Sequence, residues 1–266
     1  MRVELRGPLT LGAAVLSFST MSALAKVAGT GLPSSEIVFF RGIFGLPVLL
    51  GMAWVKGVSL AGNRRDLLLA RSAAGSVALM LLFYAVTRIP LADAILLSQT
   101  APVFVLPLAF LVLGERITWV QVIFVFTALA GTALVLDPGA RVINLPGIAA
   151  LTAAVCAACA YVLISKLSAT EHTLTIVVWF TVMSTLLAIP FMVPGFVVPG
   201  GKDLLVLVGM AAFGTLGQLL MTRAYSHGKA GRLAVIGSLG AVFGAGYDLA
   251  IFGHLPGHAT IVGGLL

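Results

Sequence analysis

Residues 67–86 read LLLARSAAGSVALMLLFYAV, and residues 206–225 read VLVGMAAFGTLGQLLMTRAY. Each stretch is almost wholly apolar and is about 20 residues long, the length that a helix needs to cross a bilayer. A shift of 139 positions (206 minus 67) aligns the two stretches without gaps and places Gly75 on Gly214. The pair therefore predicts that one membrane-spanning unit occurs twice in this chain.

The start of the chain repeats in the same way. A shift of 140 positions (147 minus 7) places Gly7, Ala13, Ala14, Lys26 and Phe40 on Gly147, Ala153, Ala154, Lys166 and Phe180. We therefore divide the chain into a first repeat at 1–140 and a second at 141–266, each with five apolar segments. Because five is odd, the two repeats must enter the membrane from opposite sides, and inverted repeats of this kind are typical of secondary transporters.

The pattern predicts an all-α integral membrane protein with ten transmembrane helices, arranged as two inverted five-helix repeats. The last segment begins at residue 258 and is too short to cross a bilayer, so we expect the tenth helix to be truncated in this sequence. The predicted segments are 8–27, 36–55, 67–87, 93–112, 119–136, 147–166, 172–193, 203–226, 232–252 and 258 onward.

The composition excludes a soluble domain, because 60% of the residues are hydrophobic and only 9% are charged. The net charge of +7 does not indicate a nucleic-acid partner, since the basic residues lie in the breaks between spans. The positive-inside rule favours a cytoplasmic N-terminus, and we expect a multi-pass protein of the plasma (inner) membrane. The inner basic residues are then Arg2, Arg6, Lys56, Arg64, Arg65, Arg116, Lys166, Lys229 and Arg232, against Lys26, Arg88, Arg141 and Lys202 outside.

The fourth predicted segment contains Ser98-Gln99-Thr100-Ala101-Pro102, followed by Pro107. A proline removes one backbone N–H and clashes with the carbonyl four residues back, so it interrupts a helix. The ninth segment, its repeat partner, is instead rich in glycine. Interrupted segments at matching positions of two halves indicate a transport site near the midplane. The alternative is that the prolines only kink a helix and the glycines only allow close packing.

The eighth segment carries a polar stripe. Thr215, Gln218, Thr222 and Tyr225 follow a spacing that places them on one helical face. In hydrocarbon these groups would lack hydrogen-bond partners, so the face must meet protein or a water-filled cavity. Bonding between helices without any ligand is the alternative for each Thr. Gln218 is the better candidate for contact with a polar solute.

Three ionisable side chains, Arg41, Arg223 and Asp248, fall inside predicted spans. A charge at the centre of a span costs roughly 2.5–3.5 kcal/mol, so such residues are functional candidates by default. Snorkelling of both arginines to the interface is the alternative. Asp93 and Glu36 lie in first helical turns, where a carboxylate favours the positive end of the helix dipole. We find no carboxylate at mid-depth, which disfavours a proton-coupled mechanism.

The sequence contains only weak candidates for catalytic, metal-binding or phosphate-binding motifs. Cys156 and Cys159 share a helical face, but no His or other Cys is near them in sequence. The serine at 238 and the aspartate at 248 each miss the glycine spacing of intramembrane proteases, and we find no phosphate-binding glycine-rich loop. We therefore expect no catalytic residue, no metal and no cofactor.

The first half contains Arg41, Ala85, Ala92-Asp93-Ala94, Pro102, Leu113-Gly114-Glu115-Arg116-Ile117-Thr118 and Gly131. The second contains Ala224, Gly231, the glycine-rich ninth segment and Phe252-Gly253-His254. These motifs resemble an EamA-type permease of the drug/metabolite transporter superfamily, over essentially the whole chain. Two positions depart from that pattern: His254 stands where the family usually has the Glu of a Gly-Glu pair, and Ala241 stands where a proline is common.

The resemblance implies a central cavity lined mainly by helices one, three, four, six, eight and nine. It also implies export of small metabolites, often amino acids or related polar or amphipathic solutes, by alternating access. The partners of the protein would be a small-molecule substrate and the lipid bilayer. Coupling of transport to a proton or to a counter-solute is left open. The predicted substrate contacts are Ser98, Gln99, Thr215, Gln218, Thr222, Arg223 and Asp248, and the predicted gating residues are Pro102, Pro107, Gly237, Gly240 and Gly244. The alternative function is a membrane-embedded enzyme or a non-transporting scaffold.

Overall fold

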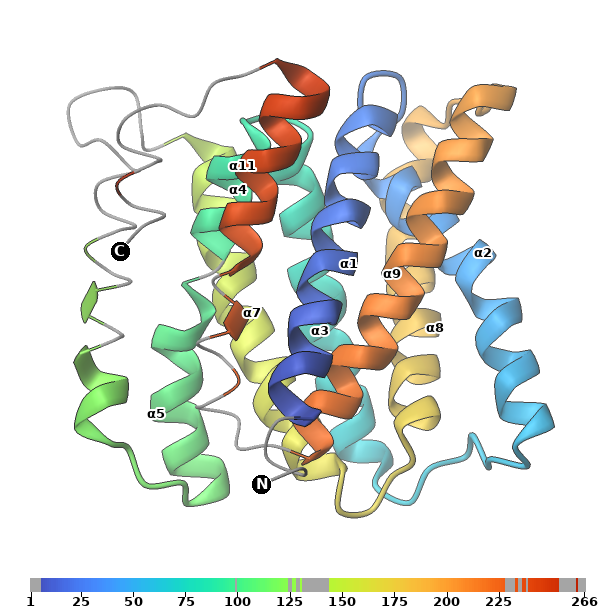
Figure 1. The fold of residues 1–266 in the computed structure, drawn as a ribbon. Coiled ribbons are helices and arrows are strands. Elements are labelled where there is room, and N and C mark those ends of the chain that lie inside the picture. Colours follow the sequence, from blue (N-terminus) through green and yellow to red (C-terminus); the bar gives the residue numbers. More distant parts are fainter. Residues whose placement is uncertain are drawn as a thin grey trace.

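The computed structural model describes residues 6–98, 100–123, 126–127, 130, 144–227, 233, 236–237, 239–253 and 262, and within these ranges all regular structure is helical (Figure 1). The first half contains α1 (Arg6–Ala28), α2 (Ser34–Val55), α3 (Arg65–Val86), α4 (Leu91–Ser98) and α5 (Ala101–Leu113). The second half contains α7 (Leu145–Leu167), α8 (Thr173–Met192), the short 3₁₀ turn η1 (Val193–Gly195), α9 (Gly201–His227) and α11 (Leu239–Phe252).

Within the described ranges, seven helices are long and apolar enough to cross a membrane, with α4 and α5 together forming one of them. Large apolar side chains cover their outer surface: Trp54 is 86% exposed, Leu111 75% and Leu205 76%. A surface of this kind is stable against lipid and not against water. These seven helices agree with predicted segments one to four and six to eight to within two residues at each end.

The three remaining predicted segments, the fifth, ninth and tenth, are described only in part. The ninth segment ends at Phe252, as α11 does. Of the fifth segment, 119–136, the described residues are 119–123, 126–127 and 130, and the tenth segment has only residue 262. The prediction of ten helices therefore lies partly outside the described residues.

The fourth predicted segment is divided at the place where proline interrupts the backbone ladder. α4 ends at Ser98 and α5 begins at Ala101, next to Pro102. Local bonds serve the backbone at the break: the Thr100 hydroxyl donates to the Leu97 carbonyl at 2.8 Å, and the Val103 amide donates to the Thr100 carbonyl at 2.9 Å. The prolyl ring explains the break, because residue 102 has no N–H to offer the Ser98 carbonyl.

The helix pairs that pack most extensively have counterparts in which the equivalent helices of the other half pack together. α1 packs along α9 and α7 along α3; α3 also contacts α8, as α9 contacts α2. α2 lies against α8, and α4 lies against α11. Exchanging α1 with α7, α2 with α8, α3 with α9 and the α4–α5 unit with α11 reproduces this set of contacts. In Figure 1, α1 runs upward from the N-terminus, whereas α7 runs downward to the lower loop that leads into α8.

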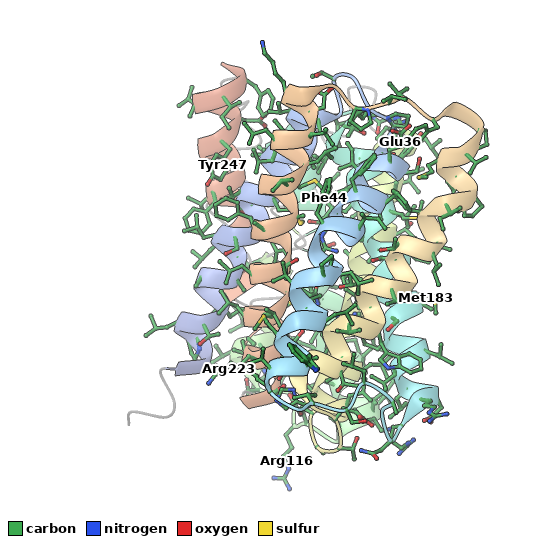
Figure 2. All side chains as sticks on the ribbon, turned by 90° about the vertical axis from the view of Figure 1, so that its right-hand side faces the viewer. Glu36, Phe44, Arg116, Met183, Arg223 and Tyr247 are labelled. Carbon is green, nitrogen blue, oxygen red and sulfur yellow. The ribbon has the colours of Figure 1, made fainter. Side chains whose placement is uncertain are left out.

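A buried carboxylate links the two halves at each end of the bundle. Glu171, before α8, accepts hydrogen bonds from the backbone N–H groups of Asn63 and Arg64, both at 2.7 Å. Glu36, in the first turn of α2, accepts one from the Val197 N–H at 2.8 Å. Figure 2 places Glu36 near the upper end of the helices, whereas the loops that contain Asn63 and Glu171 form the lower end in Figure 1. We call the contact of Glu36 with Val197 the upper clasp and the contact of Glu171 with Asn63 and Arg64 the lower clasp.

Candidate functional site

A cavity of about 160 Å³ lies among the helices and is lined by residues of α1, α2, α3, α4, α5, α7, α8 and α9 together with Gly237. Most of its lining is apolar. Its polar lining residues come from both halves of the chain and are Ser19, Ser22, Arg41, Arg71, Ser98, Tyr161, Gln218 and Tyr225. Such a mostly apolar hollow with a few converging polar groups is the usual form of a small-molecule site.

Two arginines dominate the electrostatics of this cavity. Arg41 of α2 is 3% exposed and Arg71 of α3 is 1% exposed. Arg41 Nη2 donates a long hydrogen bond of 3.4 Å to the Gly214 carbonyl, but its Nε has no partner among the described residues. The Nε and Nη1 atoms of Arg71 also have none. Three N–H-bearing atoms of buried cations therefore have no acceptor within the described part of the chain.

Phe180 of α8 lies beside both cations. Its ring centroid is 4.4 Å from the Arg71 guanidinium carbon and 5.4 Å from that of Arg41. Each such cation–π contact is worth about 0.5–2 kcal/mol, whereas one charge at the centre of a span costs roughly 2.5–3.5 kcal/mol. The ring therefore offsets only part of the cost of burying two guanidinium groups.

Two glycines make room for these side chains, and they are the pair that the repeat alignment brings together. A Cβ atom on Gly75 would lie 3.1 Å from the Phe180 ring and 3.4 Å from Arg71 Nη1. A Cβ atom on Gly214 would lie 2.7 Å from Arg41 Nε. The 3.1 Å and 2.7 Å distances are short for contacts of a Cβ atom, so a larger residue at either position would displace an arginine or its neighbour.

The polar stripe of α9 reaches this cavity through Gln218 and Tyr225. The Gln218 side chain is 4% exposed, and its Nε2 atom has no hydrogen-bond partner in the described part of the chain. Thr222, one turn further, is fully buried and its hydroxyl also lacks a described partner. Thr215 is half-buried and faces α2, where its hydroxyl would be 2.6 Å from a Cβ on Gly45. Only one member of the stripe among these three therefore lines the cavity.

The interrupted fourth segment contributes Ser98 and Pro102 to the lining. The Ser98 hydroxyl donates to the Ile95 carbonyl at 2.7 Å, so its oxygen keeps acceptor capacity toward the cavity. Pro107 is exposed on the outer surface, away from this site. The predicted contact at Gln99 lies outside the described residues.

The glycines of the ninth segment fall at different places. Gly237 lines the cavity. The Gly240 carbonyl accepts a bond of 3.5 Å from Ser19 of α1. Gly244 faces α4, since a Cβ there would lie 2.8 Å from Ile95 Cδ1. These residues therefore bring the α11 region against α1 and α4.

The remaining two predicted contacts are away from the cavity. Arg223 is exposed, and Figure 2 shows it in the lower part of the helix bundle, above Arg116. Asp248 of α11 is 2% exposed, and its carboxylate accepts a 2.7 Å bond from the Ala92 N–H in the first turn of α4. The same carboxylate lies 3.5 Å from Lys26 Nζ of α1. Asp248 therefore joins three helices in the described structure.

Sequence reasoning missed Arg71. It lies one and a half turns into α3, where an arginine is easily taken for a snorkelling side chain. The lining that the family resemblance implies also leaves out the second and seventh segments, α2 and α8. These contribute Phe180 and Arg41, of which Arg41 was a functional candidate because of its position inside a span. The glycine pair at 75 and 214 was the available signal, since a glycine retained in both halves suggests that a neighbouring group needs space.

Comparison with known proteins gives a consistent picture. The model of the EamA-like transporter family matches residues 5–137 and again residues 145–266. The pseudopaline exporter CntI of Pseudomonas aeruginosa (strain UCBPP-PA14) is 37% identical over 262 residues, which cover 98% of this chain and 92% of that protein. The S-adenosylmethionine uptake transporter of Rickettsia prowazekii is 23% identical over 95% of this chain and 86% of its own length.

A solved crystal structure superposes on this chain with a TM-score of 0.77. The superposition covers 97% of this chain and 92% of the other, at 20% sequence identity. At that identity the likeness concerns the fold alone.

Proposed function

Because the chain belongs to the EamA-like transporter family, we propose that it is a secondary transporter that exports small metabolites by alternating access around the cavity described above. Membrane embedding and transport follow from the family and from the seven apolar helices. The secondary mechanism, the direction and the solute are the parts that we propose.

The observation that carries this proposal is the position of the unsatisfied polar groups. Arg41 and Arg71 come from the first half and Gln218 from the second, and all three line one cavity between the helices. A buried polar group without a partner costs free energy, so the folded protein gains nothing from these groups unless something binds them. A solute that enters from one side of the membrane can supply that partner.

Two observations support two inverted five-helix repeats, 1–140 and 141–266. The packing pairs are preserved when each helix of the first half is exchanged with its counterpart, and the family model matches twice, over 5–137 and 145–266. Repeats related in this way give a transporter two similar states, each open to one side. We propose that the break between α4 and α5 at Pro102, and the glycines at 237, 240 and 244, let the helices move.

Export of amino acids or related solutes is the more specific part of the proposal. The name of the Pseudomonas relative describes an exporter, and that of the Rickettsia relative an uptake transporter. We favour export because the exporter shares 37% of its residues with this chain over 262 positions. The proposed location is the inner membrane with a cytoplasmic N-terminus. It is supported by the loop between α2 and α3, which contains Lys56 and Arg64 and lies at the lower end in Figure 1, and by Arg116, which Figure 2 labels at that end.

A membrane-embedded enzyme is the other candidate that the sequence left open. The cavity lining within the described ranges contains no Cys, His, Asp or Glu. General acid–base and covalent catalysis most often use one of these groups, within hydrogen-bond reach of a nucleophile. The lining therefore favours binding and passage of a solute.

The test is transport by purified protein reconstituted in proteoliposomes. A panel of labelled anionic, neutral and cationic amino acids and metabolites would be assayed with and without a pH gradient. We expect at least one solute to be transported by the wild-type protein, and Gln218→Leu to reduce its transport while the variant still folds and inserts. If no solute in any charge class crosses the membrane faster than in empty liposomes, the proposed function is wrong.

A further inference from the structure

The charges at the cavity are unbalanced, and this imbalance identifies the chemistry of the solute. Two buried guanidinium groups line the cavity, and no Asp or Glu lies among its described lining residues. The buried Asp248 and Glu36 are not lining residues, and their carboxylates bind the Ala92 and Val197 N–H groups respectively. A cavity with two cations and no counter-charge attracts an anion.

The hydrogen-bonding groups of the cavity lead to the same conclusion. Arg41 Nε, Arg71 Nε and Nη1, and Gln218 Nε2 are buried atoms without a described partner, and all of them are donors. Arginine can never act as an acceptor, and its planar fork of N–H groups matches the two oxygens of a carboxylate. The site therefore offers several donors to a ligand that contributes acceptors.

We propose that the solute is an organic carboxylate, that its carboxylate binds the Arg71 guanidinium, and that Arg41 supplies the second positive charge at the same site. This inference rests on the proposed transport function and names the substrate class of that site. The mostly apolar remainder of the lining, with Leu79, Phe180 and the stacked Tyr161–Tyr225 pair (ring centroids 5.0 Å apart), receives an apolar part of the solute.

The two arginines have unequal roles. Arg71 has two N–H-bearing atoms without a described partner, Nε and Nη1, so it can donate to two acceptor atoms. Arg41 already donates to the Gly214 carbonyl through Nη2, and among its buried atoms only Nε lacks a described partner. A solute with one carboxylate should therefore depend mainly on Arg71, and a second carboxylate should bring in Arg41.

The first experiment measures binding without transport. The melting temperature of the purified protein in detergent would be recorded with three probes that share one body and differ in the head group: 3-phenylpropionate, 3-phenylpropionamide and 3-phenylpropylamine. Phenylsuccinate adds a second carboxylate, and inorganic phosphate tests the other anion that an arginine fork accepts. We expect dose-dependent stabilisation by the two carboxylates, stronger for phenylsuccinate, and none by the amide or the amine.

Variants locate the effect. Arg71→Gln should weaken stabilisation by 3-phenylpropionate at least tenfold in concentration, and Arg71→Lys should fall between it and the wild type because it keeps the charge but not the fork. Arg41→Gln should remove the additional effect of phenylsuccinate. The matched control is Arg65→Gln, which removes an exposed arginine from the first turn of the same helix and should leave all responses unchanged.

A structural role for Arg71 predicts a different result. If Arg71 holds the bundle together, its replacement by an apolar side chain of similar length lowers the melting temperature. If it is kept for a ligand, Arg71→Met removes an uncompensated buried charge, and the protein without ligand should melt at a higher temperature. A lower melting temperature of Arg71→Met, equal stabilisation by the acid and the amine, or a response to phosphate but to neither carboxylate would each overturn the inference.

The result also separates this inference from the transport proposal. Transport of neutral or cationic solutes that Arg71→Gln leaves unchanged would overturn the carboxylate site but keep a transporter. Binding of carboxylates that depends on Arg71, in a protein that moves none of the panel, would keep the site and reject transport.

Discussion

At the scale of single residues, small side chains decide where charge can be buried. Gly214 of α9 leaves space for the Arg41 side chain, and Gly75 of α3 leaves space for the side chains of Arg71 and Phe180. Each of these glycines lowers the stability of its helix by about 1 kcal/mol relative to alanine. Their position beside the two buried arginines gives a reason for that cost, because a Cβ atom would occupy the volume that the guanidinium groups use.

The first prediction compares two glycines of α9. Gly214→Ala should lower the free energy of unfolding by about 1–3 kcal/mol, since its Cβ would lie 2.7 Å from Arg41 Nε and 2.8 Å from Met21 Sδ. Gly209→Ala places its Cβ at an ordinary 3.5 Å from Leu24 and should be neutral or slightly stabilising. Thermal melts of the two variants in the same detergent check this, and equal melting temperatures would contradict it.

The sequence predicted some of the residues that line the cavity and missed others, for physical reasons. Gln218 was predicted because a polar group at helical spacing in a span stands out against hydrocarbon. Arg71 was not, because an arginine near a helix end has a second explanation, snorkelling, that only the packing of α3 against α7 and α8 excludes. Asp248 was predicted as a substrate contact, and the structure instead gives it partners on α1 and α4 that lie far from it in sequence.

At the scale of elements, Asp248 acts as a cap for a helix to which it does not belong. The first N–H groups of a helix have no partner inside it, and a carboxylate at that end is favourable. Asp248 of α11 accepts the Ala92 N–H of α4 and lies 3.5 Å from Lys26 of α1, which also donates to the Ile89 carbonyl at 3.1 Å. One ion pair thus holds together the ends of three helices.

The second prediction tests this ion pair. Lys26→Met leaves the Asp248 carboxylate buried with only one hydrogen bond, so the free energy of unfolding should fall by roughly 1–3 kcal/mol. Asp248→Asn keeps an acceptor for the Ala92 N–H and should cost less than Asp248→Ala. In the double variant Lys26→Met/Asp248→Asn no charge is left unpaired, so it should be more stable than Lys26→Met alone. Strictly additive losses in a double-mutant cycle would mean that the pair does not interact.

Element boundaries were predictable where composition changes sharply. Segments one to four and six to eight were located to within two residues because charged or glycine- and proline-containing breaks separate them. The break between α4 and α5 was predictable from Pro102, since the consequence of a missing N–H is local. Which helices neighbour one another was not predictable from hydropathy, because lipid-facing and protein-facing positions are both apolar in membrane helices.

At the scale of the whole molecule, the two halves meet through the clasps and through a shared cavity. The third prediction concerns their orientation, which the basic residues indicate. Single cysteines at Asn63 and Asn144, in a background with Cys156 and Cys159 replaced by alanine, should react with an impermeant maleimide from opposite sides. Asn144→Cys should label in intact cells and Asn63→Cys only after permeabilisation. Labelling of Asn63→Cys in intact cells would reverse the orientation.

The clasps are the devices at the two ends of the bundle that alternating access would have to open. The upper clasp joins Glu36 of the first half to the Val197 N–H of the second, and the lower clasp joins Glu171 of the second half to the N–H groups of Asn63 and Arg64 in the first. Each charged bond is worth about 1.5–3 kcal/mol, and a change of 1.4 kcal/mol shifts a two-state population tenfold. Loss of one clasp should therefore favour the state in which that end is open.

The last prediction follows from the position of the two clasps at opposite ends of the bundle. In the cysteine-free background with Ser98→Cys as reporter in the cavity, Glu171→Ala should raise labelling from the lower side and Glu36→Ala should raise it from the upper side. The effect of Glu171→Ala should be the larger, because two bonds are lost instead of one. Asp203→Ala is the matched control, since its carboxylate accepts the Gly200 N–H at 3.0 Å within one loop and joins no halves. If both clasp variants shift the labelling to the same side, or neither differs from Asp203→Ala, the two ends do not open in alternation through these contacts.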